Sequence, residues 1–309
     1  MTTQSTVRRL LPISDLLLFA VAMVWGSSYG IVKSALAFYP VLALLALRFG
    51  ITFALLAMNL RHLRRASAAT LGGVFVLGLL LLSIFLAETF GVLHTRAANA
   101  AFLISLCVVL TPLVEWALLK RRPGSSEWLA VGVSFAGAWL LAGDGALAFD
   151  FNPGDGLILV AAVLRALTVC VTKRVLRAAP LPALTVTAVQ AGVVASGSAL
   201  IALMFAPSQW QPLPALSGHG VFWGSVLYLV GACTLFAFFA QNYAISRSSP
   251  TRVSLLMGSE PAFGALFASA WLGEHVSTTG WIGGAMIVAA SLMATVPWSG
   301  MFATRPERA

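Results

Sequence analysis

Residues 66–87 read ASAATLGGVFVLGLLLLSIFLA and contain no Asp, Glu, Lys or Arg. Two further stretches also lack these residues, 178–246 over 69 positions and 276–304 over 29. An α-helix needs about 20 apolar residues to cross the hydrocarbon of a bilayer, whereas the strands of a membrane β-barrel alternate apolar and polar positions. Because these runs do not alternate, they predict an all-α membrane protein.

The composition of the whole chain excludes a soluble domain. Of the 309 residues, 59% are hydrophobic and only 9% are charged, against about 25% charged residues in soluble domains. The mean hydropathy is +0.92, and a soluble protein of this size cannot hide so much apolar surface from water. The net charge of +9 would suggest nucleic acid in a soluble chain. Here we expect membrane lipid, and no nucleic acid, as a partner.

Charged residues, prolines and glycines divide the chain into ten candidate membrane spans. We predict them at residues 13–36, 41–60, 71–94, 97–119 and 127–143, and at 156–176, 183–205, 221–245, 250–272 and 279–296.

The cations are distributed unequally around these spans. If every span crosses, fifteen of the 19 Lys and Arg residues lie on one side, before the first span and at the ends of the even-numbered ones. The positive-inside rule places this side, and with it both termini, in the cytoplasm. Lys33 and Arg96 fall on the opposite side, while Arg48 and Arg165 fall inside spans.

The chain also contains an internal duplication. Lys33 recurs 140 residues later as Lys173, and in a later block Ser125 recurs after 152 residues as Ser277. Each half holds five spans, and because five is odd the second half enters the membrane from the opposite side.

This pattern predicts two inverted five-helix repeats, residues 1–146 and 147–309, related by a pseudo-two-fold axis in the membrane plane. Secondary transporters commonly use such repeats, because two inverted halves can rock and expose one midplane site to either side alternately.

Several motifs resemble the EamA-type transporters of the drug/metabolite transporter superfamily. They are Trp25-Gly26 up to Lys33, Arg48-Phe49, Glu260-Pro261, Trp271-Leu272-Gly273-Glu274, Ser277 and Gly283-Gly284. The resemblance implies ten helices in two inverted repeats and export of small metabolites across the bacterial inner membrane. Leu86-Ala87-Glu88 and the later His94 are similar to amino-acid exporters of the YddG kind. This similarity implies aromatic or other neutral amino acids as substrates, carried by alternating access at a central cavity.

The charge at Arg165 lies about nine residues inside its span, roughly 14 Å at helical rise. A charge at this depth usually faces a cavity or a partner. Two interpretations stay open: Arg165 lines the pathway and meets a substrate carboxylate, or it forms an ion pair with a buried acid. Trp25 occupies the matching position of the first repeat. Its indole could stack on an aromatic or cationic substrate, or it could serve packing.

Three acids lie inside predicted spans, Glu88, Glu115 and Glu260. Glu115 is one turn from Lys120 and the arginines beyond it, so we expect it to be paired or to extend to the surface. Glu88 and Glu260 could bind an amino group or carry a coupling proton. Glu260 precedes Pro261, whose missing amide frees a backbone carbonyl.

The remaining candidates for substrate binding are polar, aromatic or sulfur-containing side chains on the same faces. They are Ser28, Asn99, Phe102, Ser105, Thr168, Gln241, Ser254 and Met257. We expect Arg48 to extend outward to the membrane surface or to pair structurally. The first half lacks the Glu-Pro pair, and the nearest proline is Pro112. The break in the fourth span is therefore predicted to be displaced toward Pro112.

Other functional classes find little support in the sequence. No metalloprotease or serine-hydrolase motif is present, which argues against an enzyme, and no charge ring or repeated filter indicates a channel. Cys107, Cys170 and Cys233 lie singly in apolar segments, so we expect packing thiols and no metal. We expect a small-molecule substrate, no cofactor, and a functional monomer.

Overall fold

The computed structural model describes residues 12–95, 97–142, 152–273 and 275–295, and within these ranges all regular structure is helical. The elements are α1 (Ile13–Leu36), α2 (Val41–Leu56), η1 (Ala57–Leu63), α3 (Ala68–His94), α4 (Ala97–Ser105), α5 (Cys107–Leu119), α6 (Ser125–Ala142), α7 (Pro153–Ala178), α8 (Ala183–Phe205), η2 (Pro207–Gln209), α9 (Gly220–Tyr228), η3 (Leu229–Phe236), α10 (Ala237–Arg247), α11 (Pro250–Met257), α12 (Glu260–Leu272) and α13 (Thr278–Thr295). The prediction of an all-helical membrane protein is confirmed.

Eight helical segments of the described chain are long and apolar enough to cross a membrane. A ninth is α1, whose parts Ile13–Ser28 and Gly30–Leu36 meet at an angle of 41°. The fifth predicted span is also helical, as the 18-residue α6, so each of the ten predicted ranges contains helix. The predicted boundary between the repeats, at residues 146 and 147, lies outside the described residues and stays a prediction.

Capping residues set two helix starts earlier than the hydropathy pattern predicts. The Ser67 side chain accepts a hydrogen bond from the Thr70 amide, so α3 begins at Ala68. In α7 the side chains of Asn152 and Asp155 each accept from the other's backbone amide, a capping box that starts the helix at Pro153. Polar caps satisfy the free amides of a first turn, and hydropathy does not register them.

Two predicted spans are interrupted near their middles, at matching positions of the two halves. The α4–α5 segment is broken at Leu106, and the α11–α12 segment at Gly258 and Ser259; Leu106 and Gly258 are 152 residues apart, the offset of the duplication. The prediction of a break near Pro112 is wrong, because Pro112 lies inside the continuous helix α5. The break follows the repeat and not the proline.

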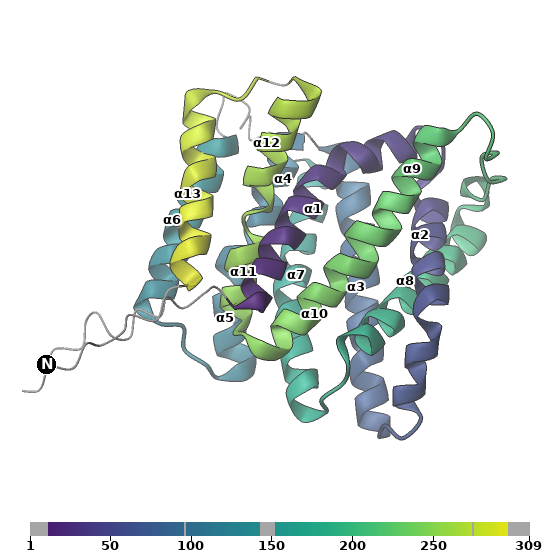
Figure 1. Ribbon diagram of the computed structural model, residues 1–309, viewed down its shortest axis with the longest axis horizontal. Helices are drawn as coiled ribbons and strands as arrows, with labels where there is room; N and C mark the ends of the chain where they lie inside the picture. Colours follow the sequence, from purple (N-terminus) through teal and green to yellow (C-terminus); the bar gives the residue numbers. More distant parts are fainter. Residues whose placement is uncertain (1–11, 96, 143–151, 274, 296–309) are drawn as a thin grey trace, which may run out of the picture.

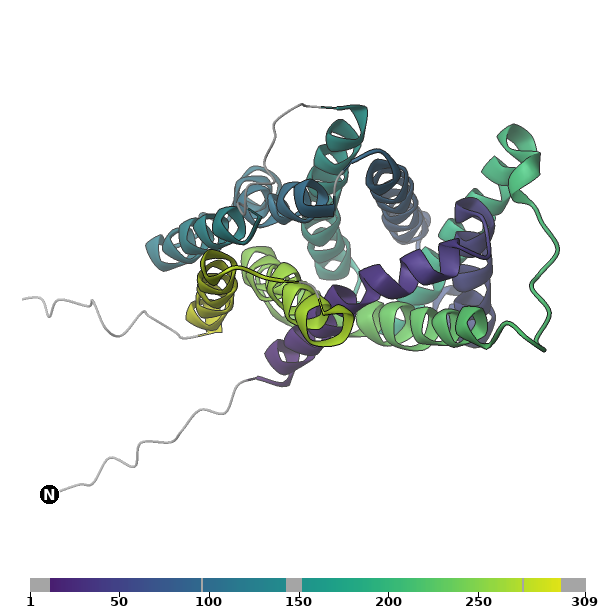
Figure 2. The ribbon, with the colours of Figure 1, turned by 90° about the horizontal axis from the view of Figure 1, so that it is seen from above.

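Close packing joins helices from the two halves. At Gly137 of α6 a Cβ atom would lie 2.6 Å from the Gly283 carbonyl oxygen of α13, so only glycine allows this contact. Figures 1 and 2 show α6 beside α13 at one end of the bundle, and Figure 1 shows α2 near α8 at the other. Large apolar side chains such as Phe205 and Leu227 are mostly exposed, as expected for a surface that faces lipid.

Candidate functional site

Three charged side chains from three helices meet inside the bundle. Arg165 of α7 donates from Nη2 to both carboxylate oxygens of Glu88 in α3, at 3.0 and 3.2 Å, and from Nη1 to Oε2 of Glu260 in α12, at 3.2 Å. The side chains of Arg165, Glu88 and Glu260 are 21%, 18% and 7% exposed. This acidic centre, Glu88–Arg165–Glu260, is therefore shielded but still reached by water-sized molecules.

Trp25 of α1 borders the acidic centre. The guanidinium carbon of Arg165 lies 5.6 Å from the centroid of the indole ring, within cation–π range. The indole Nε1 donates to the Cys233 carbonyl oxygen at 3.0 Å, and the ring packs on Phe238 with centroids 5.4 Å apart. The predicted residues Trp25, Glu88, Arg165 and Glu260 are thus brought together.

A glycine next to Trp25 makes this approach possible. A Cβ atom at Gly26 would lie 2.7 Å from both the Glu260 carbonyl oxygen and the Gly264 amide nitrogen. The backbone of α1 therefore lies directly on the first turn of α12, and this contact holds Trp25 beside Glu260.

The sequence around Glu260 starts a helix in the middle of the span. Pro261 occupies the first turn of α12, where its missing amide costs no hydrogen bond. The Ser259 hydroxyl donates to the Leu256 carbonyl oxygen at 2.6 Å and satisfies the end of the preceding helix. A carboxylate in a helical first turn interacts favourably with the helix dipole, and Glu260 occupies this position of α12 while it pairs with Arg165.

Within the acidic centre itself two carboxylates face one guanidinium, and Arg48, whose charge also acts on Glu88, forms no ion pair with either acid. The second carboxylate can therefore accept a cationic group from a ligand. The two interpretations of Arg165 are decided in part: it forms ion pairs with buried acids. A substrate carboxylate would have to displace one of them.

Three of the other predicted residues use their hydroxyl groups within their own helices. Ser28 donates to Trp25 O at 2.8 Å, Ser105 to Phe102 O at 2.6 Å and Thr168 to Leu164 O at 2.8 Å. Such back-bonding is the ordinary behaviour of helical Ser and Thr, and a role in substrate binding stays a prediction for all three.

Four more candidates lie among neighbouring helices. Phe102 packs on Phe135 and Trp139 of α6. Ser254 accepts a hydrogen bond from Thr111 at 3.0 Å between α11 and α5. Met257 packs against a buried apolar cluster that includes Leu18, Val169 and Ile245, and Gln241 is buried in α10. The side chain of Asn99 lies outside the described residues.

Of the two environments expected for Arg48, the structure shows the buried one: the residue is 6% exposed and does not extend to the membrane surface. Its Nε donates to Oγ1 of Thr234 at 2.5 Å. Thr234 lies in η3, a π-helix, a form that often marks functional sites. Arg48 was noticed as a charge inside a span, but it was not predicted as a site residue and no pattern indicated its partner.

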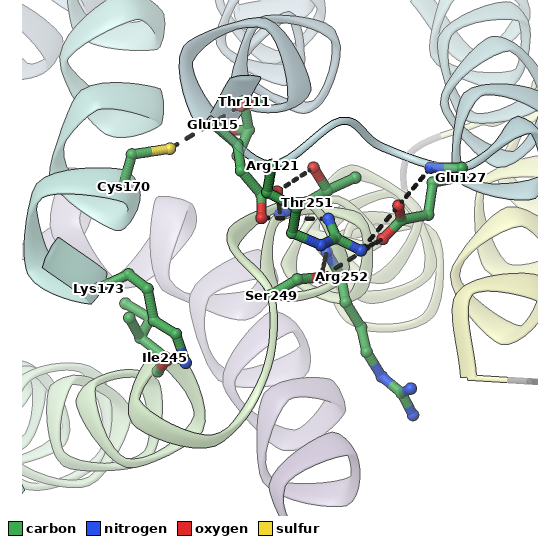
Figure 3. A network of polar contacts seen from close by, with 11 residues as sticks. Thr111, Glu115, Arg121, Glu127, Cys170, Lys173, Ile245, Ser249, Thr251 and Arg252 are labelled. Atoms are coloured by element: carbon green, nitrogen blue, oxygen red, sulfur yellow. Dashed lines mark hydrogen bonds and ion pairs between the residues drawn. The ribbon is translucent and has the colours of Figure 1, made fainter. Parts of the chain in front are cut away.

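At one end of the bundle a second polar network joins the two halves (Figure 3). Arg121 donates to Glu115 at 3.1 Å and to both oxygens of Glu127 at 2.9 and 3.0 Å. The fully buried Glu115 accepts from the Thr251 amide at 2.9 Å and from its hydroxyl at 2.5 Å. We call Glu115, Arg121, Glu127 and Thr251 the polar clasp. The prediction that Glu115 is paired is confirmed.

Other contacts strengthen the same end. Arg252 of α11 forms an ion pair with the buried Asp15 near the start of α1. Lys173 donates to the carbonyl oxygens of Ile245 and Ser246, at 2.8 and 3.0 Å, in the last turn of α10, where a cation complements the helix dipole. Helix ends from both halves are therefore tied together here.

Comparison with known proteins assigns the family. The EamA-like transporter family matches the chain twice, over residues 12–143 and 152–296. The chain is 27% identical over 293 residues to YedA, an uncharacterized inner membrane transporter of Escherichia coli K12, covering 94% of this chain and 92% of YedA. It is 27% identical over 290 residues to an uncharacterized transporter of Archaeoglobus fulgidus, covering 91% and 97%.

The fold is found in a solved structure as well. One crystal structure superposes with a TM-score of 0.76 at 22% sequence identity, covering 94% of this chain and 99% of the other. The family model matches the chain twice, its helices are apolar, and a relative matched over nearly its full length is an inner membrane transporter. The molecule is therefore a multi-pass membrane transporter and not an enzyme. The chain belongs to the EamA-like transporter family.

Proposed function

We propose that the protein is a secondary transporter that exports small zwitterionic metabolites, most readily aromatic or other neutral amino acids, across the bacterial inner membrane. The observation that carries this proposal is the acidic centre beside Trp25, next to the interruption between α11 and α12. An excess carboxylate suits the ammonium group of an amino acid, and an indole suits an aromatic side chain. Interrupted helices at the midplane are typical of secondary-transporter sites.

The proposed topology has ten spans in two inverted repeats, with both termini in the cytoplasm. The matching interruptions at Leu106 and Gly258 support two copies of one unit. The lower side of Figure 1 carries the connections after η1, α5, α7 and α10, and these connections contain or adjoin most of the cations of the described chain. The positive-inside rule assigns this side to the cytoplasm.

In this topology the polar clasp lies on the cytoplasmic side and closes it. Glu115 of the first half accepts two hydrogen bonds from Thr251 of the second, and Arg121 holds Glu115 from its own half. Transport by alternating access then requires that the clasp opens while the opposite end closes. Because the two halves exchange these arrangements, the acidic centre between them would face each side of the membrane in turn.

Counterflow in proteoliposomes tests the proposal. Proteoliposomes that contain the purified protein are loaded with unlabelled L-phenylalanine, and the uptake of labelled L-phenylalanine is measured. The rate is compared with that of proteoliposomes without internal substrate and of liposomes without protein. A carrier gives saturable uptake that is accelerated by internal substrate, whereas a channel or lipid translocator gives neither. Uptake that responds to another amphipathic metabolite or drug, and to no amino acid in a panel of the twenty, would contradict the substrate class and leave the family assignment intact.

Arg165→Met provides the control on the site itself. It leaves Glu88 and Glu260 without their shared guanidinium, and we expect counterflow to fall at least about tenfold, since charge-assisted hydrogen bonds are typically worth 1.5–3 kcal/mol each. Arg61→Gln, at an exposed position in η1, removes the same charge at the surface and is expected to leave counterflow unchanged. Equal counterflow rates in Arg165→Met and Arg61→Gln would show that the acidic centre has no role in transport.

A further inference from the structure

Arg48 is a buried cation without a carboxylate partner in the part of the chain that the structure describes. It lies inside α2, and no described Asp or Glu forms an ion pair with it. A buried charge normally requires a partner, because the cost of removing it from water is several kcal/mol. Its environment must therefore supply the compensation in another way.

Part of the compensation comes from aromatic rings. The guanidinium carbon lies 5.2 Å from the centroid of Phe49 and 5.4 Å from that of Phe85. The Phe49 and Phe85 rings pack on each other with centroids 4.8 Å apart, and both rings contact Phe238. Because Phe238 also packs on Trp25, a continuous set of aromatic side chains connects Arg48 to the acidic centre.

The hydrogen bonds of Arg48 leave one edge of its guanidinium group unused. Nε donates to Thr234, whose own hydroxyl donates to the Leu229 carbonyl oxygen at 2.7 Å and so presents a lone pair to Nε. Neither Nη1 nor Nη2 donates to a described acceptor. The two terminal nitrogens together form the edge that binds a carboxylate through two parallel hydrogen bonds.

This free edge is not sealed from its surroundings. Among the described residues, the buried side-chain nitrogen and oxygen atoms without a partner are Oγ1 of Thr172, Oγ of Ser198 and Nε of Arg252. Nη1 and Nη2 of Arg48 are not among them, so both nitrogens, although they lack a described acceptor, are reached by water-sized molecules. The Glu88 carboxylate is near enough to interact electrostatically with Arg48, so the free edge and the acidic centre lie in the same region of the bundle.

We propose that Arg48 binds the carboxylate of the transported molecule through its two terminal nitrogens, while the acidic centre receives the ammonium group. This inference rests on the proposed function and makes Arg48, not Arg165, the anionic-group receptor. Both terminal nitrogens of Arg165 are already held by Glu260 and Glu88. Phe85, which is partly exposed, would contact the apolar part of the substrate, with the buried Phe49 and Phe238 packed behind it. Thr234 is a positioning residue that orients the guanidinium group.

Two probes with one skeleton test this assignment. L-phenylalanine carries both charged groups, and 2-phenylethylamine lacks only the carboxylate. Apparent Kd values for both are measured on the purified full-length protein from ligand-dependent thermal shifts. For the wild type, we expect L-phenylalanine to bind at least about tenfold more tightly, because the carboxylate adds charge-assisted hydrogen bonds. Arg48→Gln is expected to abolish this preference and leave the amine's Kd within twofold.

The control and the contrary outcomes separate the inference from the proposed function. Arg61→Gln is expected to keep the full preference. An unchanged preference in Arg48→Gln, or an equal weakening of both ligands, would overturn the inference alone. A wild type that binds neither probe nor any amino acid would overturn the proposed function and the inference with it.

A second pair of variants covers the case in which Arg48→Gln does not fold. Thr234→Val keeps the charge but removes the acceptor of Nε, and we expect L-phenylalanine to bind several-fold more weakly while 2-phenylethylamine is unaffected. Arg48→Lys keeps the charge without the two-nitrogen edge and is expected to lose most of the preference. A purely structural Arg48 would give no ligand-selective change in either variant.

Discussion

Gly26→Ala should separate two helices that the acidic centre needs in contact. The added methyl group would lie 2.7 Å from the Glu260 carbonyl oxygen and the Gly264 amide nitrogen, and 3.1 Å from a backbone carbon of Phe263. All three atoms belong to the backbone of α12, so no side chain can rotate away. Ordinary contacts begin at 3.4 Å, so α1 and α12 must move apart by about 0.7 Å.

The energetic cost follows from two opposed effects. Overpacking of this kind costs about 1–3 kcal/mol. Replacing a helical glycine by alanine gains up to about 1 kcal/mol through helix propensity. The net loss of stability is therefore about 1 kcal/mol, equivalent to roughly 2 °C or more in apparent Tm. Because Trp25 moves with its helix, counterflow should fall as well.

A matched variant isolates the steric term. Gly132→Ala in α6 makes the same chemical change where nothing lies within 4 Å of the added carbon, so only the gain in propensity remains. We expect Gly132→Ala to melt about 4 °C above Gly26→Ala in detergent, because the difference equals the overpacking cost. Equal melting temperatures and equal counterflow rates in the two variants would refute the proposed helix contact.

Three further variants test other parts of the molecule. Glu115→Gln, at the fully buried acid of the polar clasp, should cost about 2 kcal/mol because it removes the charge from the hydrogen bonds with Arg121 and Thr251; a loss no greater than that of the partly exposed Glu127→Gln would argue against a central role for Glu115. Lys120→Gly should raise the stability by about 1 kcal/mol, since Lys120 adopts φ 57° at the end of α5 and glycine carries no left-handed penalty; a lower Tm would contradict this. Asn152→Ala removes the cap of α7 and should cost about 1 kcal/mol, measured as a drop in Tm that Asn152→Asp does not show.

The fold was largely predictable because membrane helices leave a strong record in hydropathy. Each predicted range contains helix. The errors concern helix starts, which are set by side-chain hydrogen bonds to the first turn. Ser67 and Asn152 begin their helices three residues before the apolar pattern does. The interruption at Leu106 lacks a proline or glycine of its own, and it packs against the interruption of the other half, where a Cβ at Gly258 would lie 2.5 Å from Cγ2 of Val108. Such contacts between halves cannot be inferred from one segment.

The candidate site was predictable in part, for a related reason. Charges inside spans are rare enough to be noticed, and Glu88, Arg165 and Glu260 were identified in this way and do meet. Which partner a buried charge finds depends on distant residues, so for Arg48 the sequence left two environments open, the membrane surface and a structural pair. Its acceptor, Thr234, is 186 positions away and lies in a π-helical segment that no residue pattern indicated.

The polar clasp also imposes an order of events during biosynthesis. Glu115 accepts its hydrogen bonds from Thr251, 136 positions further along the chain. At about 5–20 residues per second, roughly 7–27 s of translation separate the two residues. Arg121, only six positions after Glu115, emerges almost at once and can neutralise the acid during this interval. The arginine would then act as a temporary partner for a nascent first half, until the second half arrives and completes the pair.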